Sequence, residues 1–226
     1  MATIIETEDD IASTLETPVD TNDVSLQVEY LFASSIWQAK APQFLDSVTA
    51  VHKEVIAQRK KEAPKILKSV YPSIMSNNIH LDPRLTDFCN YINKTSWIIL
   101  NNQGYNMDLF RTVIYECFSQ EHHRYGGHNT HTHPGGQITG FYFVDTPPNS
   151  SRPIFQDPRA GKIHNNLPER DTNKATLASY EINYQPGPGD FIFSNSWLPH
   201  SFIHNSSTKP YKFIHFTVGV EIIPQL

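Results

Sequence analysis

Three histidines have the types and the spacing that a metal site requires. His131 and His133 are separated by one residue, and His200 closes the later segment Trp197-Leu198-Pro199-His200. Imidazole is the commonest metal-binding side chain near neutral pH. In an extended strand, residues i and i+2 point to the same face, so His131 and His133 could bind one ion. Together with His200 they predict a mononuclear metal centre whose remaining coordination positions are open for chemistry.

The residues around His131 and His133 are typical of a strand that ends in a turn. Gly126 and Gly127 precede the pair, and Pro134-Gly135-Gly136 follows it directly. Glycine and proline on both sides argue against a helix, in which positions i and i+2 point in different directions. Two histidines with this spacing also occur in surface loops that bind no metal. The prediction of a metal site therefore depends on the distal His200.

Composition predicts one folded domain preceded by an acidic arm. The chain has 226 residues, 38% of them hydrophobic, which is enough for one sizeable core. Residues 1–23 contain seven Asp or Glu residues and no Lys or Arg, and they lack a periodic apolar face. We expect a flexible arm over residues 1–23 and a single domain over residues 24–226.

Charge and cysteine content narrow the function classes. The formal net charge is −5 and no long Lys/Arg cluster is present, which argues against nucleic acid as a ligand. The two cysteines, Cys89 and Cys117, cannot form a disulfide framework, and no apolar run is long enough to cross a membrane. We therefore expect a cytoplasmic protein with no membrane partner.

The sequence places helices before strands. Apolar residues recur at helical spacing from Pro42 to about Gln58, and a second helix is expected from Asp82, its N-cap, through Ile92. Helical support thus spans about residues 42–93, and a β core spans about residues 95–223. The expected strands cover residues 24–30, 96–100, 112–119, 137–144, 153–156, 180–184, 190–195, 200–203 and 211–223. This order predicts an α+β fold with a β-sandwich or barrel core that presents the histidines at its mouth.

Several segments together resemble one enzyme family. They are Tyr125 to Gly136 with Thr139 to Val144, then Pro153 to Arg159, Pro188 to Phe193 leading to Trp197-Leu198-Pro199-His200, and Lys212 to Val218. In this order and spacing they resemble the 2-oxoglutarate/Fe(II)-dependent oxygenases of bacteria and phages. The resemblance covers roughly residues 95–220.

The resemblance implies a fold, a reaction and its cofactors. The fold would be a double-stranded β-helix, a jelly-roll or cupin-like core with the N-terminal helices packed on one sheet. The metal would be Fe(II), with 2-oxoglutarate as co-substrate and O2 as oxidant. The enzyme would hydroxylate a C–H bond of a protein side chain or a small metabolite and release succinate and CO2.

We favour a protein side chain because the loops around the mouth are long. The location would be the host cytoplasm if the chain is phage-encoded. The sequence predicts no oligomeric state.

The resemblance also suggests where 2-oxoglutarate binds. Oxygenases of this type often place Arg or Lys on the strand after the distal histidine, so Lys212 is the expected partner of the far carboxylate. Thr139 and Tyr142, which follow the histidine pair, could donate hydroxyl groups to the co-substrate. If Lys212 points inward, strand alternation sends His215 to the opposite face and excludes it as a ligand.

His133 departs from the family pattern, because it stands where these oxygenases carry Asp or Glu. Three alternatives remain open. All three histidines bind the metal; or the register shifts to His128 and His131; or a distant carboxylate such as Asp157 completes the site. If Asp157 is not a ligand, we expect it in a turn, where it forms an ion pair with Arg159.

Two more histidines, His122 and His123, lie among charged residues and are expected to be solvated.

Two other functions fit the same residues. A three-histidine cupin with Zn or Mn would act as a hydrolase, isomerase or lyase through a metal-bound water, and it would need no oxoacid partner. A non-catalytic binding module on the same barrel would need no metal. Metal content and dependence on O2 distinguish the three.

Overall fold

The computed structural model describes residue 27 and residues 32–70, 72–164 and 167–224. The chain divides into two units, residues 1–33 and residues 34–226, and the description below concerns the second. The acidic arm expected over residues 1–23 lies outside the described residues, as does nearly all of the strand expected over residues 24–30. The domain boundary at residue 24 stays a prediction.

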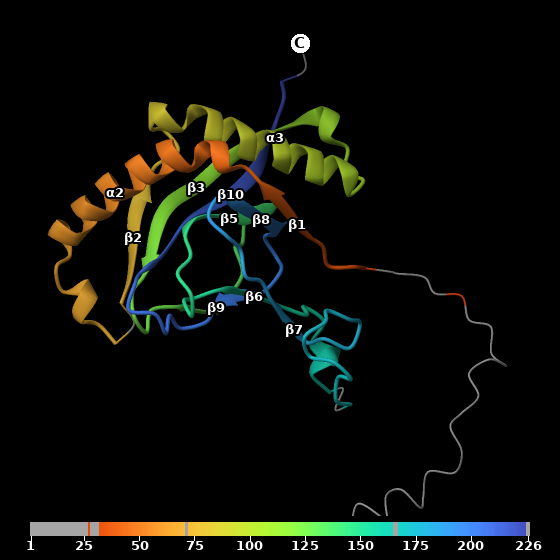
Figure 1. Ribbon diagram of the computed structural model, residues 1–226. Coiled ribbons are helices and arrows are strands. Elements are labelled where there is room, and N and C mark those ends of the chain that lie inside the picture. Colours follow the sequence, from red (N-terminus) through yellow and green to blue (C-terminus); the bar gives the residue numbers. More distant parts are fainter. Residues whose placement is uncertain (1–26, 28–31, 71, 165–166, 225–226) are drawn as a thin grey trace, which may run out of the picture. The chain divides into compact units, whose positions relative to one another are not determined.

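Two antiparallel sheets form the core of this unit (Figure 1). Within the described residues the larger sheet has the order β1-β8-β5-β10-β3-β2 and the smaller one the order β4-β9-β6-β7. Their bounds are β1 Ile36–Lys40, β2 Ser73–Asn78, β3 Phe110–His122, β4 His128–His131, β5 Ile138–Asp145, β6 Pro153–Gln156, β7 Glu181–Asn183, β8 Asp190–Asn195, β9 His200–Phe202 and β10 Tyr211–Ile222. The two sheets confirm the predicted α+β fold with a jelly-roll core.

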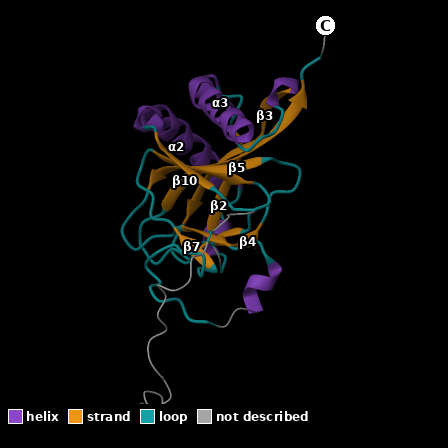
Figure 2. Cartoon of the chain, turned by 90° about the vertical axis from the view of Figure 1, so that its right-hand side faces the viewer, coloured by secondary structure: helices purple, strands orange, loops and turns teal. Residues whose placement is uncertain are grey.

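Two helices cover the outer face of the larger sheet: α2 (Leu45–Glu62) and α3 (Thr86–Asn102). Figure 2 shows both helices on the side of this sheet that faces away from the smaller sheet. Their buried positions recur every three or four residues, so each helix presents one apolar stripe. On α2 these are Val48, Val51 and Ile56, with His52 among them; on α3 they are Phe88, Cys89, Ile92, Ser96, Ile99 and Leu100. The predicted packing of helices on one sheet is confirmed.

A second core fills the space between the sheets, which we call the barrel interior. It is largely aromatic and comprises Phe141, Phe143, Phe155, Ile192, Leu198, Phe202, Tyr211 and Phe213. Strand β5 is buried along almost its whole length because the helices cover one of its faces and the smaller sheet covers the other. Phe141 and Phe143 face the barrel interior, whereas Ile138, Tyr142 and Val144 face the helices.

The predicted elements differ from the structure in three places. The expected strand at residues 96–100 is wrong, because α3 continues to Asn102. Trp97, Ile99 and Leu100 have strand-type side chains, but they extend the stripe that Phe88 and Ile92 begin. Strands β1 and β2 were not anticipated. Asp82 caps a helical turn as expected, since its side chain accepts a hydrogen bond from the Arg84 amide.

Among the described residues no helix is long and apolar enough to cross a membrane.

Candidate metal centre

Strand pairing brings the three predicted histidines together. His131 ends β4 and His200 begins β9, and the register of these antiparallel strands sets them directly opposite each other. The chain then turns back, and the His133 amide donates to the Ser196 carbonyl at 2.9 Å. This turn needs Gly135, whose φ of +90° is in the region that favours glycine. One nitrogen from each of the three imidazoles lies within 4.8 Å of the others.

Hydrogen bonds set which nitrogen two of these rings present. Nδ1 of His131 lies 2.8 Å from the Asn129 carbonyl oxygen, and Nδ1 of His200 lies 3.0 Å from that of Leu198. A carbonyl oxygen only accepts, so in both rings Nδ1 carries the proton and Nε2 carries a lone pair. Nε2 of His133 lies 3.2 Å from Nε2 of His200. The group therefore offers lone pairs to one region of space, as a metal requires.

Burial keeps two of the three histidines neutral. Together with the neighbouring imidazoles, it lowers the pKa of His200 to about 3 and that of His133 to about 4. Neutral imidazole is the form that binds metal, so no proton has to be displaced from these two rings near pH 7.

Aromatic rings of the barrel interior surround the centre. The ring of Phe141 lies 5.5 Å from that of His200, and the ring of Phe155 lies 5.9 Å from it. His128, of the alternative register, stands behind His131 at 5.8 Å between ring centroids and is not part of the three-histidine group. Asp157 is not part of it either, and its carboxylate pairs with Arg159 at 2.6 Å.

His215 lies beside the centre, contrary to expectation. Its Nε2 is 3.2 Å from Nε2 of His133 and 3.1 Å from Oγ1 of Thr139, and the residue is 3% exposed. Thr139 Oγ1 in turn donates to the carbonyl of Phe216 at 3.1 Å. Thr139 is thus connected to the centre through His215.

Lys212 lies on the other face of β10. Its neighbours on that face, Ile214 and Phe216, pack in the helix-side core, whereas Phe213 packs in the barrel interior. The Lys212 ammonium pairs with Asp145 at 2.8 Å, and both side chains are partly exposed. The expectation that Lys212 points toward the histidines is therefore wrong. Both faces of β10 are buried, so apolar alternation could not reveal which one faces the barrel interior.

Tyr142 also lies away from the histidines. Its ring packs in the helix-side core, and its hydroxyl donates to the Ala41 carbonyl at 2.9 Å. Burial raises its pKa, so the hydroxyl remains a donor that holds the chain at Ala41. The structure gives Tyr142 a role in packing.

A second group of polar side chains in the barrel interior was not anticipated. His122, expected to be solvated, is fully buried, and its Nδ1 lies 3.0 Å from Oγ of Ser151. The Ser151 hydroxyl donates to the Ile203 carbonyl at 2.6 Å, so His122 donates to Ser151. The Gln120 amide donates to His128 Nε2 at 2.7 Å. In the sequence, this group was indicated only by the positions of Gln120 and His122 on either side of Glu121, which place the two side chains on one face of the strand.

His123 also contacts another side chain and is not fully solvated. Its Nε2 lies 2.9 Å from Oε2 of Glu121, and its side chain is 24% exposed. Glu121 faces the helices, and its carboxylate also contacts Lys60 and His52.

These residues fit a metal better than they fit a dicarboxylate. Three neutral imidazoles are a suitable donor set for a divalent first-row metal. The described side chains in ring or hydrogen-bond contact with the three histidines are His128, Phe141, Phe155 and His215. None of them is a cation, so a partner for the far carboxylate of an oxoacid has to stand farther from the metal than these side chains do.

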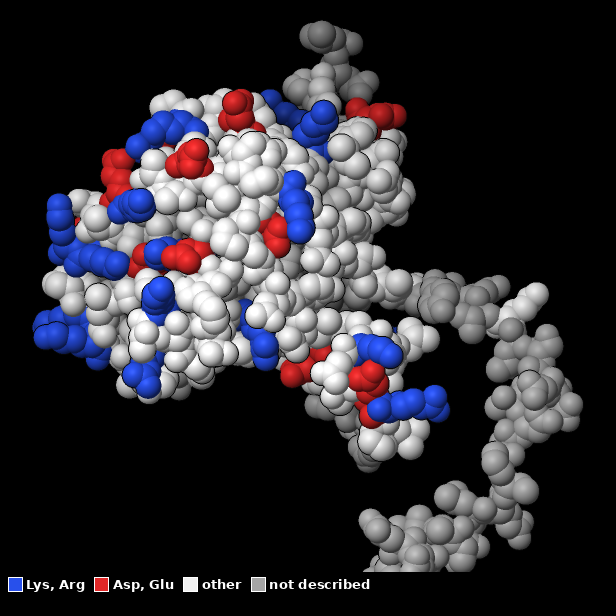
Figure 3. All heavy atoms as spheres, in the orientation of Figure 1, with Lys and Arg blue, Asp and Glu red and all other residues white. Residues whose placement is uncertain are grey.

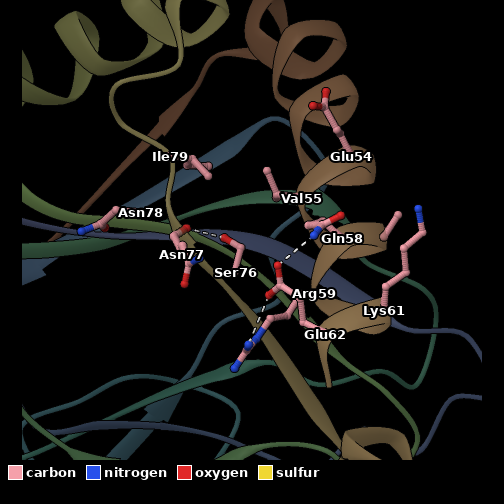
Figure 4. A pocket seen from close by; sticks show the side chains of 11 residues that line it. Glu54, Val55, Gln58, Arg59, Lys61, Glu62, Ser76, Asn77, Asn78 and Ile79 are labelled. Atoms are coloured by element: carbon pink, nitrogen blue, oxygen red, sulfur yellow. Dashed lines mark hydrogen bonds and ion pairs between the residues drawn. The ribbon is translucent and has the colours of Figure 1, made fainter. Parts of the chain in front are cut away.

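A groove of about 510 Å³ lies elsewhere, between α2 and β2 (Figure 4). Within the groove, Glu62 accepts from Gln58 at 2.9 Å and from Arg59 at 3.5 Å. In Figure 3, Lys and Arg occur together with Asp and Glu over the same face of the molecule. The groove is a solvated helix face and contributes nothing to the centre.

Comparison with known proteins agrees with the geometry. Residues 116–216 match the family described as "Putative 2OG-Fe(II) oxygenase", and this segment contains all three histidines. No curated protein matches the chain.

Solved structures of low sequence identity share the fold. AviO1 from Streptomyces viridochromogenes has a TM-score of 0.57 and 12% identity, covering 85% of this chain and 92% of its own. A prolyl-4-hydroxylase from Pseudomonas putida has a TM-score of 0.54 and 10% identity, covering 82% and 92%. HygX from Streptomyces hygroscopicus, solved with nickel and 2-oxoglutarate, has a TM-score of 0.52 and 10% identity, covering 82% and 83%. The double-stranded β-helix is thus the shared fold, and residues 116–216 of the chain match the 2OG-Fe(II) oxygenase family.

Proposed function

We propose that the chain is an Fe(II)- and 2-oxoglutarate-dependent hydroxylase whose metal is held by Nε2 of His131, His133 and His200. The observation that carries the proposal is the convergence of these nitrogens, two of them with their proton fixed on the opposite side of the ring. With 2-oxoglutarate and O2, the iron supplies the oxidising power for a C–H hydroxylation that releases succinate and CO2. The protein orients the ligands and excludes water.

The side chains around the centre orient the ligands and exclude water. Backbone carbonyls hold the rings of His131 and His200 in one orientation, as the outer partners of metal-binding histidines generally do. His215 lies 3.2 Å from the same Nε2 of His133, and Thr139 holds the His215 ring at 3.1 Å. Phe141 and Phe155 form an apolar wall against His200, which limits the access of water to a reactive centre.

A protein side chain remains our preferred substrate. The structurally similar proteins include a prolyl hydroxylase from Trichoplax adhaerens in complex with a peptide fragment, and HygX with hygromycin B bound. Both substrate classes therefore occur on this fold. The long segment between β6 and β7 exposes Leu167 and Leu177, which favours a protein partner.

The decisive test is anaerobic titration of the purified protein with Fe(II) and 2-oxoglutarate. A visible metal-to-ligand charge-transfer band is expected, followed by succinate release when O2 is admitted. The absence of both would overturn the proposal.

The all-histidine ligand set has its own consequence. Neutral ligands leave the charge of Fe(II) uncompensated until the oxoacid binds, so metal retention should depend strongly on 2-oxoglutarate. His133→Asp restores a charged ligand and should weaken this dependence, while His133→Ala should lose the metal. Equal iron affinity of the wild type with and without 2-oxoglutarate would contradict this.

A second candidate is a three-histidine Zn or Mn enzyme that uses a metal-bound water. The three-histidine donor set favours it, because imidazole also suits Zn, and such an enzyme needs no oxoacid. Metal analysis of protein purified without added metal distinguishes the two, together with an assay for turnover under nitrogen. Zn or Mn with no requirement for O2 would support the second candidate.

A further inference from the structure

A small polar pocket of about 140 Å³ lies apart from the three histidines, where the loop before β6 meets the start of β10. Its lining includes Ser151 and Arg152 from that loop, Gln185 from the segment after β7, and Tyr211. Two of these side chains are hydrogen-bond donors without an acceptor. The groove beside α2 has one such donor, Arg59 Nε, but the Arg59 guanidinium pairs with Glu62, whereas Arg152 pairs with no carboxylate of the described residues.

Tyr211 is the first of these donors. It is 1% exposed, and its hydroxyl has no hydrogen-bond partner. Burial raises its pKa well above the ordinary range, so the hydroxyl keeps its proton and can donate. A buried phenol normally finds a partner, because leaving its hydroxyl unpaired is costly. The Tyr211 hydroxyl therefore has no acceptor among the described residues, and a ligand in the pocket could supply one.

Arg152 is the second donor. Its Nε is buried without a hydrogen-bond partner, and the side chain forms no ion pair with any described residue. Its backbone is held in place, since the Arg152 carbonyl accepts from the Ile203 amide at 3.2 Å. The residue as a whole is partly exposed, and its guanidinium is always charged. The pocket thus contains a positive charge as well as an unpaired hydroxyl.

Aromatic side chains separate this pocket from the three histidines. The rings of Phe202 and Phe213 stack at 4.7 Å, and that of Tyr211 lies 6.3 Å from the first and 5.8 Å from the second. Phe141 packs at 4.9 Å from Phe202 and at 5.5 Å from His200. The pocket is therefore a separate site, and its ligand can be sought in metal-free protein.

We propose that this pocket binds the carboxylate of a small organic acid, with Arg152 and Tyr211 as its donors. A carboxylate offers two oxygens in one plane, one for each donor, and its charge matches the guanidinium. The volume restricts the acid to a few heavy atoms. Two sources share this chemistry: a free acid that enters from the surface, or the far carboxylate of an oxoacid held at the metal. The aromatic layer favours the free acid.

Calorimetry on the full metal-free chain tests the site with acetate, succinate, 2-oxoglutarate and inorganic phosphate. Arg152→Gln should weaken succinate binding at least ~10-fold and Tyr211→Phe a few-fold, because charged hydrogen bonds are the stronger ones. Arg170→Gln, an equal change of charge at an exposed position outside the pocket, is the control and should bind as the wild type does.

A second arm repeats the titration with Fe(II) bound and O2 excluded, to identify the source of the carboxylate. Succinate binding without metal that Arg152→Gln weakens supports a free acid. If 2-oxoglutarate binds only with Fe(II) and Arg152→Gln weakens that binding, the carboxylate belongs to the oxoacid. No binding in either arm overturns the proposal, as does phosphate binding tighter than any carboxylate. Circular dichroism confirms that each variant is folded, and equal affinities of the folded variants and the wild type also overturn it.

Discussion

Strand β3 carries two groups of buried polar side chains on its opposite faces, and they differ in how their charges are matched. On the helix side, the Glu121 carboxylate contacts Lys60 at 2.8 Å, His123 at 2.9 Å and His52 at 3.2 Å. On the barrel side, the Gln120 amide contacts His128 and the His122 ring contacts Ser151, and no carboxylate of the described residues is among these partners. Adjacent residues of one strand therefore take part in two different kinds of polar site.

The pKa values of the ionisable side chains differ between the two groups. Burial alone would raise the pKa of Glu121, but hydrogen bonds from His123, His52 and Lys60 outweigh burial and hold it well below the ordinary value. In the barrel interior, burial lowers the pKa of His200 and His133, and no counter-charge opposes it. A buried charge with several partners stabilises a fold, whereas uncharged lone pairs that converge can bind a metal.

The largest expected effect is on metal binding. His200→Ala removes one of the three converging nitrogens and should weaken Fe(II) or Co(II) binding by more than ~100-fold, which exceeds the loss usual for an outer partner. Metal titration followed by absorbance measures this. His204→Ala is a matched control outside the three-histidine group and should bind metal as the wild type does. Unchanged affinity in His200→Ala would show that the group is not a metal centre.

On the helix side the expected effect is on stability. Glu121→Gln leaves three cationic or donor groups without their carboxylate and should lower the free energy of unfolding by about 2 kcal/mol, less than for a fully buried pair because Lys60 is 37% exposed. Urea denaturation measures it, with the exposed Glu62→Gln as control. Metal affinity should not change. A loss of metal affinity in Glu121→Gln would contradict the separation of the two groups.

The two groups should respond to pH in different windows. The pKa of Glu121 is lowered in the folded state, so its stabilisation is present above its ordinary value of 4.5 and is lost as pH falls below it. The folded pKa values of His133 and His200, about 4 and about 3, also lie below their ordinary 6.5. The unfolded chain therefore binds protons first, and metal-free protein should lose stability as pH falls from 6.5. Denaturation across pH 7 to 3 should show that His200→Ala flattens the upper window and Glu121→Gln the lower one.

His215 should have a smaller effect, because it lies beside His133 and is not part of the three-histidine group. His215→Gln should weaken metal binding by about 10-fold, the lower end of what an outer partner contributes, and should alter the visible spectrum of bound Co(II). An effect as large as that of His200→Ala would indicate that His215 itself binds the metal.

Lys212 should have the smallest effect. Lys212→Gln breaks a partly exposed pair with Asp145 and should change the free energy of unfolding by less than ~1 kcal/mol. The affinity of the Fe(II) form for 2-oxoglutarate should stay the same, and anaerobic titration checks both affinity and spectrum. A loss of more than ~10-fold would restore Lys212 as the oxoacid partner and contradict its position on the helix face.

Most elements could be predicted from local pattern. The helix that begins near Pro42 and the strands at residues 153–156 and 190–195 follow from periodicity and from Gly and Pro at their ends. Residues 96–100 could not be assigned this way, because a short apolar run fits a buried strand and a buried helix equally well. The solvation expected for His122 failed for a related reason: its charged neighbours lie on the other face of the strand.

The sequence alone determined the three histidines, their place at a strand end and a turn, and the resemblance to oxygenases, because spacing along the chain carries that information. Only the tertiary structure decided which face of β10 points into the barrel interior. It thereby moved Lys212 and Tyr142 away from the centre and brought His215 to it. The physical reason is that β5 and β10 are covered on both sides, so side chains of similar character stand on both faces and alternation does not distinguish them.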